Sequence, residues 1–223
     1  MKVGIMQPYF FPYIGYFQLI HAVDTYVNLD HVSFMKRSYM TRNSIKNDIS
    51  LNLQVKNASQ NRSCREVYVD FNHNYISKFR KTIELNYSKS PFYGSVIEQI
   101  IEPHFVENEI CVSDFNFGII KSICGYLNIG STFIETSTQF AEVGKKADGL
   151  IDITRSIGAD SYVNAIGGTK LYDKPSFKEK GVDLYFIKMD KIDLKDEYRS
   201  ILHHLFLYDP NHIRQQMNKY TLL

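Results

Sequence analysis

The first thirty residues place a strand, a loop and a helix in close succession, and this order constrains the fold more than any other stretch. Residues 2–6 (KVGIM) form a short apolar run with β-branched side chains, which indicates a buried strand. Pro8 and Pro12 keep the following segment out of regular structure, because each lacks an N–H and restricts the residue before it. From Tyr13 to Asp24 apolar residues recur at three- and four-residue steps, which predicts a helix.

A second strand is expected at residues 25–30, so that strand, helix and strand form a βαβ unit with a right-handed crossover. Ligands of open parallel sheets bind beyond the carboxyl ends of the strands. The loops at 7–12 and 30–37 would lie at that edge. We therefore expect a site for a small anionic molecule around residues 1–24.

The rest of the chain alternates between expected helices and strands. The expected elements are a hairpin of 49–54 and 66–70 with its turn at 57–64, helices at 75–87, 92–104 and 115–127, a strand at 131–136, a helix at 145–157, a strand at 161–164, a loop at 165–171, a strand at 183–187, and helices at 197–206 and 210–220. No repeat or linker interrupts the 223 residues. We expect one α/β domain over 1–223, with a Rossmann-like, mostly parallel sheet and a helical insertion near 72–128.

The composition argues against several classes of partner. The 26 Lys and Arg against 24 Asp and Glu give a net charge of +2, too little for a DNA-binding protein. The three cysteines have no metal-ligand spacing, so no metal site is predicted. No apolar stretch is long enough to span a membrane or resembles a signal peptide. These features predict a cytoplasmic protein that binds neither DNA nor a membrane.

The first candidate site lies in the loop and first helical turn. It comprises Gln7, Tyr9, Tyr13, Gly15 and Tyr16. A glycine in a helix costs about 1 kcal/mol relative to alanine. A ligand close to the helix N-terminus, where free N–H groups attract anions, would explain Gly15. The alternative is a loop whose aromatic rings pack against the sheet and bind no ligand.

This layout resembles that of nucleotidylyltransferases and pantothenate-synthetase-like ligases of the HUP-like class. In those enzymes a strand, a loop with proline and an H-x-G-H motif hold the phosphates of ATP. Residues 13–16 read Y-I-G-Y here, so the spacing is kept and both histidines are tyrosine.

The second candidate is the basic segment 30–43. Lys36, Arg37 and Arg42 can donate to phosphate or carboxylate groups, and Asn43 follows them. Asp30 comes directly after the second strand and could hold an amine or a sugar hydroxyl. A solvated basic loop is the alternative.

Two further groups complete the candidates. In the segment 164–172 Gly167 and Gly168 permit positive φ and close backbone approach, so that successive N–H groups could bind an anion. Asn164, Lys170 and Tyr172 flank them, and a plain tight turn is the alternative. Elsewhere, Glu84 at the end of a helix could act as a general base, with Tyr93 nearby in the sequence. A surface carboxylate is the other reading of Glu84.

Taken together, these segments resemble the WbqC-like family over nearly the whole chain. The matching stretches are MQPYFFPYIGYFQLI (6–20), YVNLDHVSFMKRSYMTRNSI (26–45), IELNYSKSPFY (83–93), SYVNAIGGTKLYD (161–173) and the terminal helices. Members typically occur in gene clusters for O-antigen and other surface polysaccharides, which implies a role in making or decorating a sugar precursor. Where the family is expected to read S-I-I-D near its C-terminus, this chain has His203 in place of the aspartate.

The leading hypothesis is transfer of an N-acyl or aminoacyl group to the amine of a nucleotide-linked amino sugar. The activated donor would supply the acyl group, with Asp30, Glu84 and Tyr13 as catalytic residues. The residues expected to bind substrate are Gln7, Tyr9, Gly15, Tyr16, Lys36, Arg37, Arg42, Asn43, Tyr93, Asn164, Gly167, Gly168, Lys170 and Tyr172. The alternatives are an ATP-dependent ligase or nucleotidylyltransferase-like enzyme and a non-catalytic scaffold that binds a sugar nucleotide. A homodimer is compatible with each of these three functions.

Overall fold

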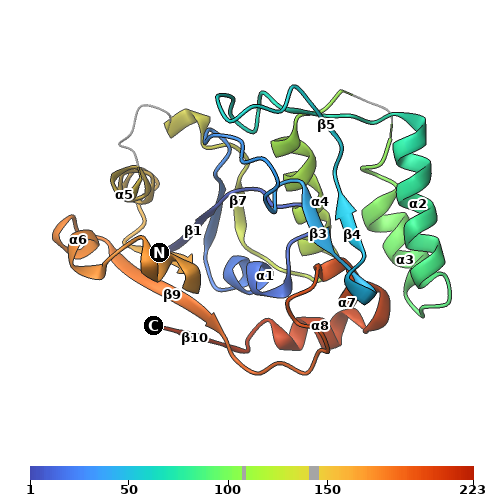
Figure 1. Cartoon of the computed structure of the whole chain (residues 1–223). Coiled ribbons are helices and arrows are strands. Elements are labelled where there is room, and N and C mark those ends of the chain that lie inside the picture. The colour runs from blue at the N-terminus through green and yellow to red at the C-terminus, as the bar shows by residue number, and fades with distance from the viewer. Residues whose placement is uncertain (107–108, 141–145) are drawn as a thin grey trace.

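The centre of the computed structural model, which describes residues 1–106, 109–140 and 146–223, is a six-stranded sheet (Figure 1). Its strands are β1 (Lys2–Met6), β2 (Thr25–Asn28), β7 (Thr132–Ile134), β8 (Ser161–Ala165), β9 (Asp183–Met189) and β10 (Tyr220–Leu222). Their order is β10-β9-β8-β1-β2-β7, and all neighbours are parallel except β9 and β10. The predicted Rossmann-like, mostly parallel sheet is therefore confirmed.

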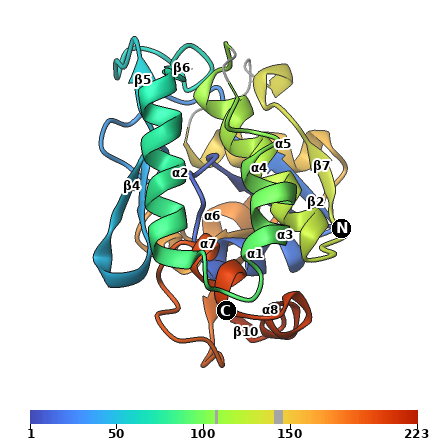
Figure 2. The ribbon, with the colours of Figure 1, turned by 90° about the vertical axis from the view of Figure 1, so that its right-hand side faces the viewer.

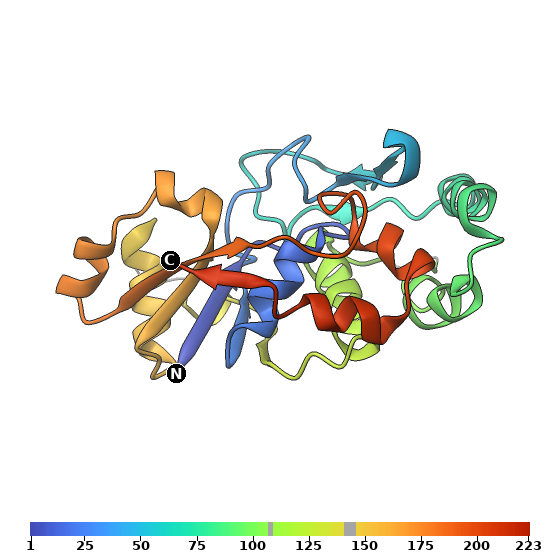
Figure 3. The same ribbon diagram turned by 90° about the horizontal axis from the view of Figure 1, so that it is seen from below.

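Helices cover both faces of this sheet (Figure 3). On one face lie α1 (Ile14–His21) and α4 (Val112–Tyr126), and on the other lie α5 (Ala147–Ser156) and α6 (Lys174–Glu179). In β1, Val3 and Ile5 point towards the α5 and α6 face, because successive side chains of a strand alternate. Gly4 faces α1, and a Cβ there would lie 2.6 Å from the Leu19 side chain. The missing side chain lets α1 approach β1 closely.

The strand order reverses beside β1. The chain runs outward from β1 through α1 to β2 and on to β7, and then returns through α5 to β8 on the other side of β1. Ser161 pairs with Lys2 on that side, and Thr25 pairs with Val3 on the opposite side. At such a switch point the two neighbouring loops diverge and leave a crevice beyond the carboxyl ends of the strands.

A long insertion between β2 and β7 packs on the α1 face (Figure 2). It contains β3 (Arg42–Ser44), the 3-10 turn Lys46–Asp48, β4 (Ser50–Asn52), β5 (Val55–Lys56), β6 (Tyr68–Val69), α2 (His73–Tyr87), α3 (Tyr93–Val96), the π-helical turn Ile97–Ile101 and α4. Its core is aromatic: the rings of Phe79 and Phe105 stack at 4.0 Å, and Phe11 from the first loop stacks on both. The insertion thereby anchors the loop that follows β1.

The predicted hairpin is wrong in its pairing. The strand β4 pairs with β3, so that Leu51 lies opposite Asn43, in a basic segment where no strand was expected. The turn at 57–64 instead joins β5 to β6, with Val55 opposite Val69. Alternation of apolar and polar residues identifies a strand without identifying its partner, and this accounts for the error.

Several boundaries in the C-terminal half also differ from expectation. The helix expected at 197–206 is α7 (Ile201–Leu207), which starts where the Ser200 hydroxyl accepts from the Leu202 N–H. The expected helix 92–104 is divided between α3 and the π-helical turn, and the expected loop 165–171 contains the 3-10 helix Ile166–Lys170.

The last expected helix ends early, as α8 (Pro210–Gln216), and the chain then forms β10. The sequence analysis predicted neither α6 nor β10. The expected helix 145–157 is α5, and Lys145 lies outside the described residues. Within the described ranges, no helix combines the length and apolar character needed to cross a bilayer.

Candidate functional site

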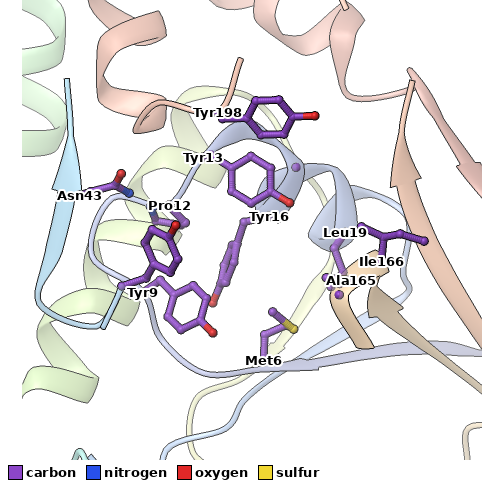
Figure 4. A pocket seen from close by; sticks show the side chains of 13 residues that line it. Met6, Tyr9, Pro12, Tyr13, Tyr16, Leu19, Asn43, Ala165, Ile166 and Tyr198 are labelled. Atoms are coloured by element: carbon purple, nitrogen blue, oxygen red, sulfur yellow. The ribbon is translucent and has the colours of Figure 1, made fainter. Parts of the chain in front are cut away.

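A cavity of about 370 Å³ opens at the carboxyl ends of β1 and β8, where the strand order reverses (Figure 4). We call it the tyrosine cavity. It is lined by Met6, Tyr9, Pro12, Tyr13, Gly15, Tyr16, Leu19, Tyr39, Asn43, Ala165, Ile166, Gly167 and Tyr198. Its position is that of the ligand crevice in doubly wound sheets, and its volume lies within the range of small-molecule sites.

The loop between β1 and α1 is held in one shape by buried anchors. Phe11 has a φ of 43°, a left-handed conformation that is costly for a bulky residue, and its ring is fully buried. The Asn43 side-chain amide donates to the carbonyl oxygens of Phe10 and Phe11, at 3.3 and 2.7 Å. The Asn116 amide donates to the carbonyl of Pro8 at 3.0 Å. The insertion thus fixes the backbone that carries Tyr9 and Tyr13.

In the first turn of α1 the Tyr13 side chain occupies the place of a Cβ at residue 15. A Cβ on Gly15 would lie 2.4 Å from Cε2 of Tyr13, so the Tyr13 ring rests against the glycine backbone. The expected reason for Gly15 was a ligand at this backbone. In the structure the side chain of Tyr13 fills that space, and Tyr13 also supplies one wall of the cavity.

Three tyrosine hydroxyls of the cavity, those of Tyr9, Tyr13 and Tyr16, stay protonated at neutral pH. Burial raises the pKa of Tyr9 and Tyr13, and neighbouring tyrosines raise both further. Burial also raises the pKa of Tyr16, whose hydroxyl contacts that of Tyr26 and donates to the Gln7 carbonyl at 2.8 Å. The proton of the Tyr16 hydroxyl is therefore already used, whereas the hydroxyls of Tyr9 and Tyr13 can donate to a ligand but are poor proton acceptors.

The predicted phosphate ligands flank this cavity without lining it. Lys36, Arg37 and Arg42 are exposed, and within the described ranges none of them forms an ion pair. Tyr39 and Asn43 from the same segment do line it. Since side chains alternate along a strand, Arg42 on β3 points away from the face that Asn43 presents.

Asp30 is placed in a buried polar cluster rather than in the cavity lining. Its side chain is fully buried, and one carboxylate oxygen accepts from Arg65 at 2.7 Å. The other accepts from the backbone N–H of Ser137 at 2.8 Å, from the Ser137 hydroxyl at 2.9 Å and from Thr136 at 3.1 Å. The bond to Asp30 is the main cause that raises the pKa of Arg65. This cluster ties the end of β2 to the insertion and to the segment after β7.

Glu84 and Tyr93 lie in other places. Glu84 is exposed on α2 and lines a separate open groove with Arg80 and Lys81. Tyr93 packs against Phe206, with ring centroids 5.9 Å apart. Neither residue is brought together with the tyrosine cavity.

Of the site residues predicted in the segment 164–172, Gly167 lines the cavity, and its neighbours Ala165 and Ile166 line it as well. The expected positive φ is wrong for Gly167 and Gly168, because neither adopts it. Gly168 is needed for packing, since a Cβ there would lie 2.5 Å from the Asn164 amide nitrogen. Lys170 is exposed, and Tyr172 packs against α6.

Comparison with known proteins adds the family. A family model described as the WbqC-like protein family matches residues 7–213. This chain belongs to the WbqC-like protein family. A Mycobacterium tuberculosis relative, named Uncharacterized protein Rv1507c, is 26% identical over 194 residues, which cover 85% of this chain and 83% of the relative. No solved structure matches the chain.

In this WbqC-like protein, several lining residues escaped the sequence analysis. Tyr39 lies inside a segment that was singled out, and its ring is 5.8 Å from that of Tyr9. Tyr198 is 73% exposed and lies 6.1 Å from Tyr13 between ring centroids, although 185 positions separate the two. Met6, Leu19 and Ile166 read as ordinary strand, helix and turn residues. No local pattern could have assigned Tyr198 to this site.

The cavity combines aromatic and aliphatic walls with neutral hydroxyl donors. All of its lining side chains within the described residues are uncharged. Such walls suit a ring-shaped ligand that stacks on tyrosine and accepts hydrogen bonds from the hydroxyls. Charged parts of the same ligand would extend to the rim, where the segment of Lys36 and Arg37 adjoins Tyr39.

Proposed function

We propose that this WbqC-like protein transfers an acyl or aminoacyl group to the amine of a nucleotide-linked amino sugar used for surface polysaccharide. The observation that carries the proposal is the tyrosine cavity, formed at the switch crevice by the most distinctive motif of the chain. The sugar ring would stack in the cavity. The phosphates would extend to the rim and meet Lys36, Arg37 or Arg42.

The reaction forms one bond and breaks one bond at the carbonyl carbon, and it moves one proton from the amine to the leaving group. The amine nitrogen attacks the carbonyl of the activated donor and forms the C–N bond, while the bond from that carbon to the leaving group breaks. The amine loses a proton, and the leaving group departs with one. Protonated hydroxyls of Tyr9 and Tyr13 are suited to donate to the oxyanion that forms in between.

The proposed reaction also needs a base that accepts the proton of the amine. Asp30 and Glu84 were the candidates, and neither lines the cavity. Asp30 already accepts from Arg65, Ser137 and Thr136, so its free lone pairs are few. Glu84 is exposed, but it faces the groove on α2.

A second candidate function is a non-catalytic scaffold that binds a sugar nucleotide for other enzymes. The uncharged lining favours it, because binding needs shape and hydroxyl donors but no proton acceptor. Such a protein would keep its ligand affinity and its cellular role after loss of the exposed Glu84.

A binding screen followed by a transfer assay tests the two candidates. The panel contains dTDP- and UDP-amino sugars, ATP with magnesium, and acyl-CoA donors, read by thermal shift. A ligand at about 100 times its Kd stabilises a protein by roughly 2.7 kcal/mol, which moves the melting temperature visibly. The amino sugars that bind are then incubated with each donor, and an acylated product is sought by mass.

The outcome of these assays distinguishes the transferase from the scaffold. Binding of an amino sugar with a gain of one acyl mass supports the transferase. Binding without transfer under any donor supports the scaffold, and a shift with ATP alone overturns both in favour of a ligase-like enzyme. Tyr9→Phe is the matched variant, because it removes one hydroxyl from the cavity and leaves the ring.

A further inference from the structure

The exposed tyrosines of this protein meet at one place. The chain has 16 tyrosines, and all of them lie within the residues that the structure describes. Among them only Tyr39 and Tyr198 are exposed, at 62% and 73%, and both line the tyrosine cavity. Single apolar side chains are common on protein surfaces, so one exposed ring would need no explanation. The meeting of both at one cavity, from segments far apart in the sequence, does need one.

Each exposed ring lies against a partly buried ring of the same cavity. The ring centroids of Tyr39 and Tyr9 are 5.8 Å apart, and those of Tyr198 and Tyr13 are 6.1 Å apart (Figure 4). The cavity therefore has two pairs of rings. In each pair one ring belongs to the loop before α1, and the other stands at the mouth.

The two exposed rings face the same space. Burial raises the pKa of Tyr13, and the neighbouring Tyr198 and Tyr39 raise it further. Because electrostatic effects fall off with distance, both exposed hydroxyls lie near that of Tyr13. A ligand at the mouth can thus contact Tyr39 and Tyr198 together.

Backbone contacts hold the segments that carry these rings. The carbonyl of Tyr39 accepts from the N–H of Phe10 at 2.8 Å. Ser200, two residues after Tyr198, donates its N–H to the carbonyl of Ser44 at 3.0 Å and pairs with Tyr13 in a β-bridge. The rings themselves stay in contact with water, so a ligand that covers them gains the free energy of burying their apolar faces.

The exposed faces suit a flat aromatic ring. A sugar ring is puckered and rich in oxygen atoms, which suits the hydroxyl donors of Tyr9 and Tyr13 further inside. A nucleobase is flat and stacks on tyrosine whatever its identity. Lys36 and Arg37 are exposed in the segment that leads to Tyr39, so they can meet phosphates that lie between a base and a sugar.

We infer that the exposed rings of Tyr39 and Tyr198 bind the nucleobase of a nucleotide ligand, with the base at the mouth and the sugar inside the cavity. The inference rests on the proposed function, because it assigns the nucleotide part of the same ligand. It also gives both tyrosines a role in binding substrate.

Two ligands that differ only in the base test this on the full chain. In ribose 5-phosphate a hydroxyl replaces the base of UMP, so the pair isolates the contribution of stacking. Each is titrated into ¹⁵N-labelled protein, and the shifts of the Tyr39 and Tyr198 amides report the mouth. UMP is expected to bind roughly 5- to 100-fold more tightly than the sugar phosphate. Equal affinities, or shifts confined to other residues, overturn the inference.

Two double variants separate the rings from their hydroxyls. Tyr39→Leu with Tyr198→Leu removes both rings, whereas Tyr39→Phe with Tyr198→Phe removes only the hydroxyls. Both positions are exposed, so both variants are expected to fold. The leucine variant should lose most of the preference for UMP, and the phenylalanine variant should keep it. A preference that survives in the leucine variant, or is lost in the phenylalanine variant, contradicts the inference.

These probes contain neither an amino sugar nor an acyl donor. A chain that binds UMP through its rings but transfers nothing disproves only the transferase. A leucine variant that acylates a UDP-amino sugar with the KM of the wild-type protein disproves only the role of the two rings.

Discussion

At several positions of this protein, the packing around the residue determines which residue type is found there. Gly15 and Gly168 have ordinary negative φ, and each is a glycine because a neighbouring side chain, Tyr13 or Asn164, occupies the place of its Cβ. The opposite case is Phe11, which keeps a large side chain at positive φ because its ring is anchored in the aromatic core. Packing, rather than backbone propensity, decides these positions.

Gly15→Ala is expected to destabilise the protein by roughly 1–3 kcal/mol, because its Cβ must displace the Tyr13 ring. Gly94→Ala is the control: Gly94 is also helical and has nothing within 4 Å of its Cβ position. The control should be neutral or stabilised by up to about 1 kcal/mol. Urea unfolding measures the stability of both variants. An equal gain in the free energy of unfolding would show that the contact with Tyr13 does not affect stability.

His204 makes stability depend on pH. It is fully buried with no hydrogen-bond partner for either ring nitrogen within the described residues, and burial lowers its pKa to about 4. The unfolded chain binds the proton below about pH 6.5 and the folded chain only below about pH 4, so stability falls as the pH drops through this window. The expected loss between pH 7 and pH 5 is on the order of 2 kcal/mol.

His204→Phe should remove most of this dependence. The neighbouring His203, whose pKa burial also lowers, keeps a smaller slope of the same sign. Urea unfolding of both proteins at pH 7 and pH 5 gives the comparison. If the wild-type protein and the variant lose the same free energy between the two pH values, His204 is not the group responsible.

At the scale of elements, the loop 7–12 depends on strands that lie later in the chain. Asn43 on β3 donates to two consecutive carbonyls of that loop, and it also lines the tyrosine cavity. A short edge strand of the insertion thus sets the shape of the candidate site.

Asn43→Ala should cost about 1–3 kcal/mol of stability and free the loop, because the carbonyls of Phe10 and Phe11 lose their donor. Arg42→Ala on the same strand is the control, since Arg42 is exposed and should change stability by less than about 0.5 kcal/mol. Hydrogen exchange of the loop amides and urea unfolding are the measurements. Unchanged exchange in Asn43→Ala would mean that Phe10 and Phe11 alone hold the loop.

At the scale of the whole molecule, the sheet and the insertion are joined by a buried charge. Asp30 lies two residues beyond the end of β2, Arg65 belongs to the insertion, and Ser137 follows β7. Three segments far apart in sequence therefore meet at one carboxylate.

Arg65→Met is expected to destabilise the protein by about 3–5 kcal/mol, because it leaves the buried Asp30 without its cation. Lys121→Met removes the exposed pair with Glu135, also near the end of β7, and should cost less than about 1 kcal/mol. Equal losses in urea unfolding would show that the buried pair has no structural role.

The sequence determined the parts that depend on near neighbours. The apolar run 2–6, the prolines of the loop and the helical period after Tyr13 predicted β1, the loop and α1, because strand and helix periodicity is a local property. The alternation of helices and strands predicted the mostly parallel sheet. Tyr9, Tyr13, Gly15 and Tyr16 were predicted substrate or catalytic residues, and the structure places all four around one cavity.

Only the tertiary structure decided what closes that cavity. The return of the chain from β7 to β8 brings Ile166 and Gly167 beside β1, and the segment before α7 brings Tyr198 over Tyr13. Strand partners and the pairing of Asp30 with Arg65 are set by contacts between distant segments. No local pattern encodes them, because the residues of one segment do not specify which distant segment will pack against it.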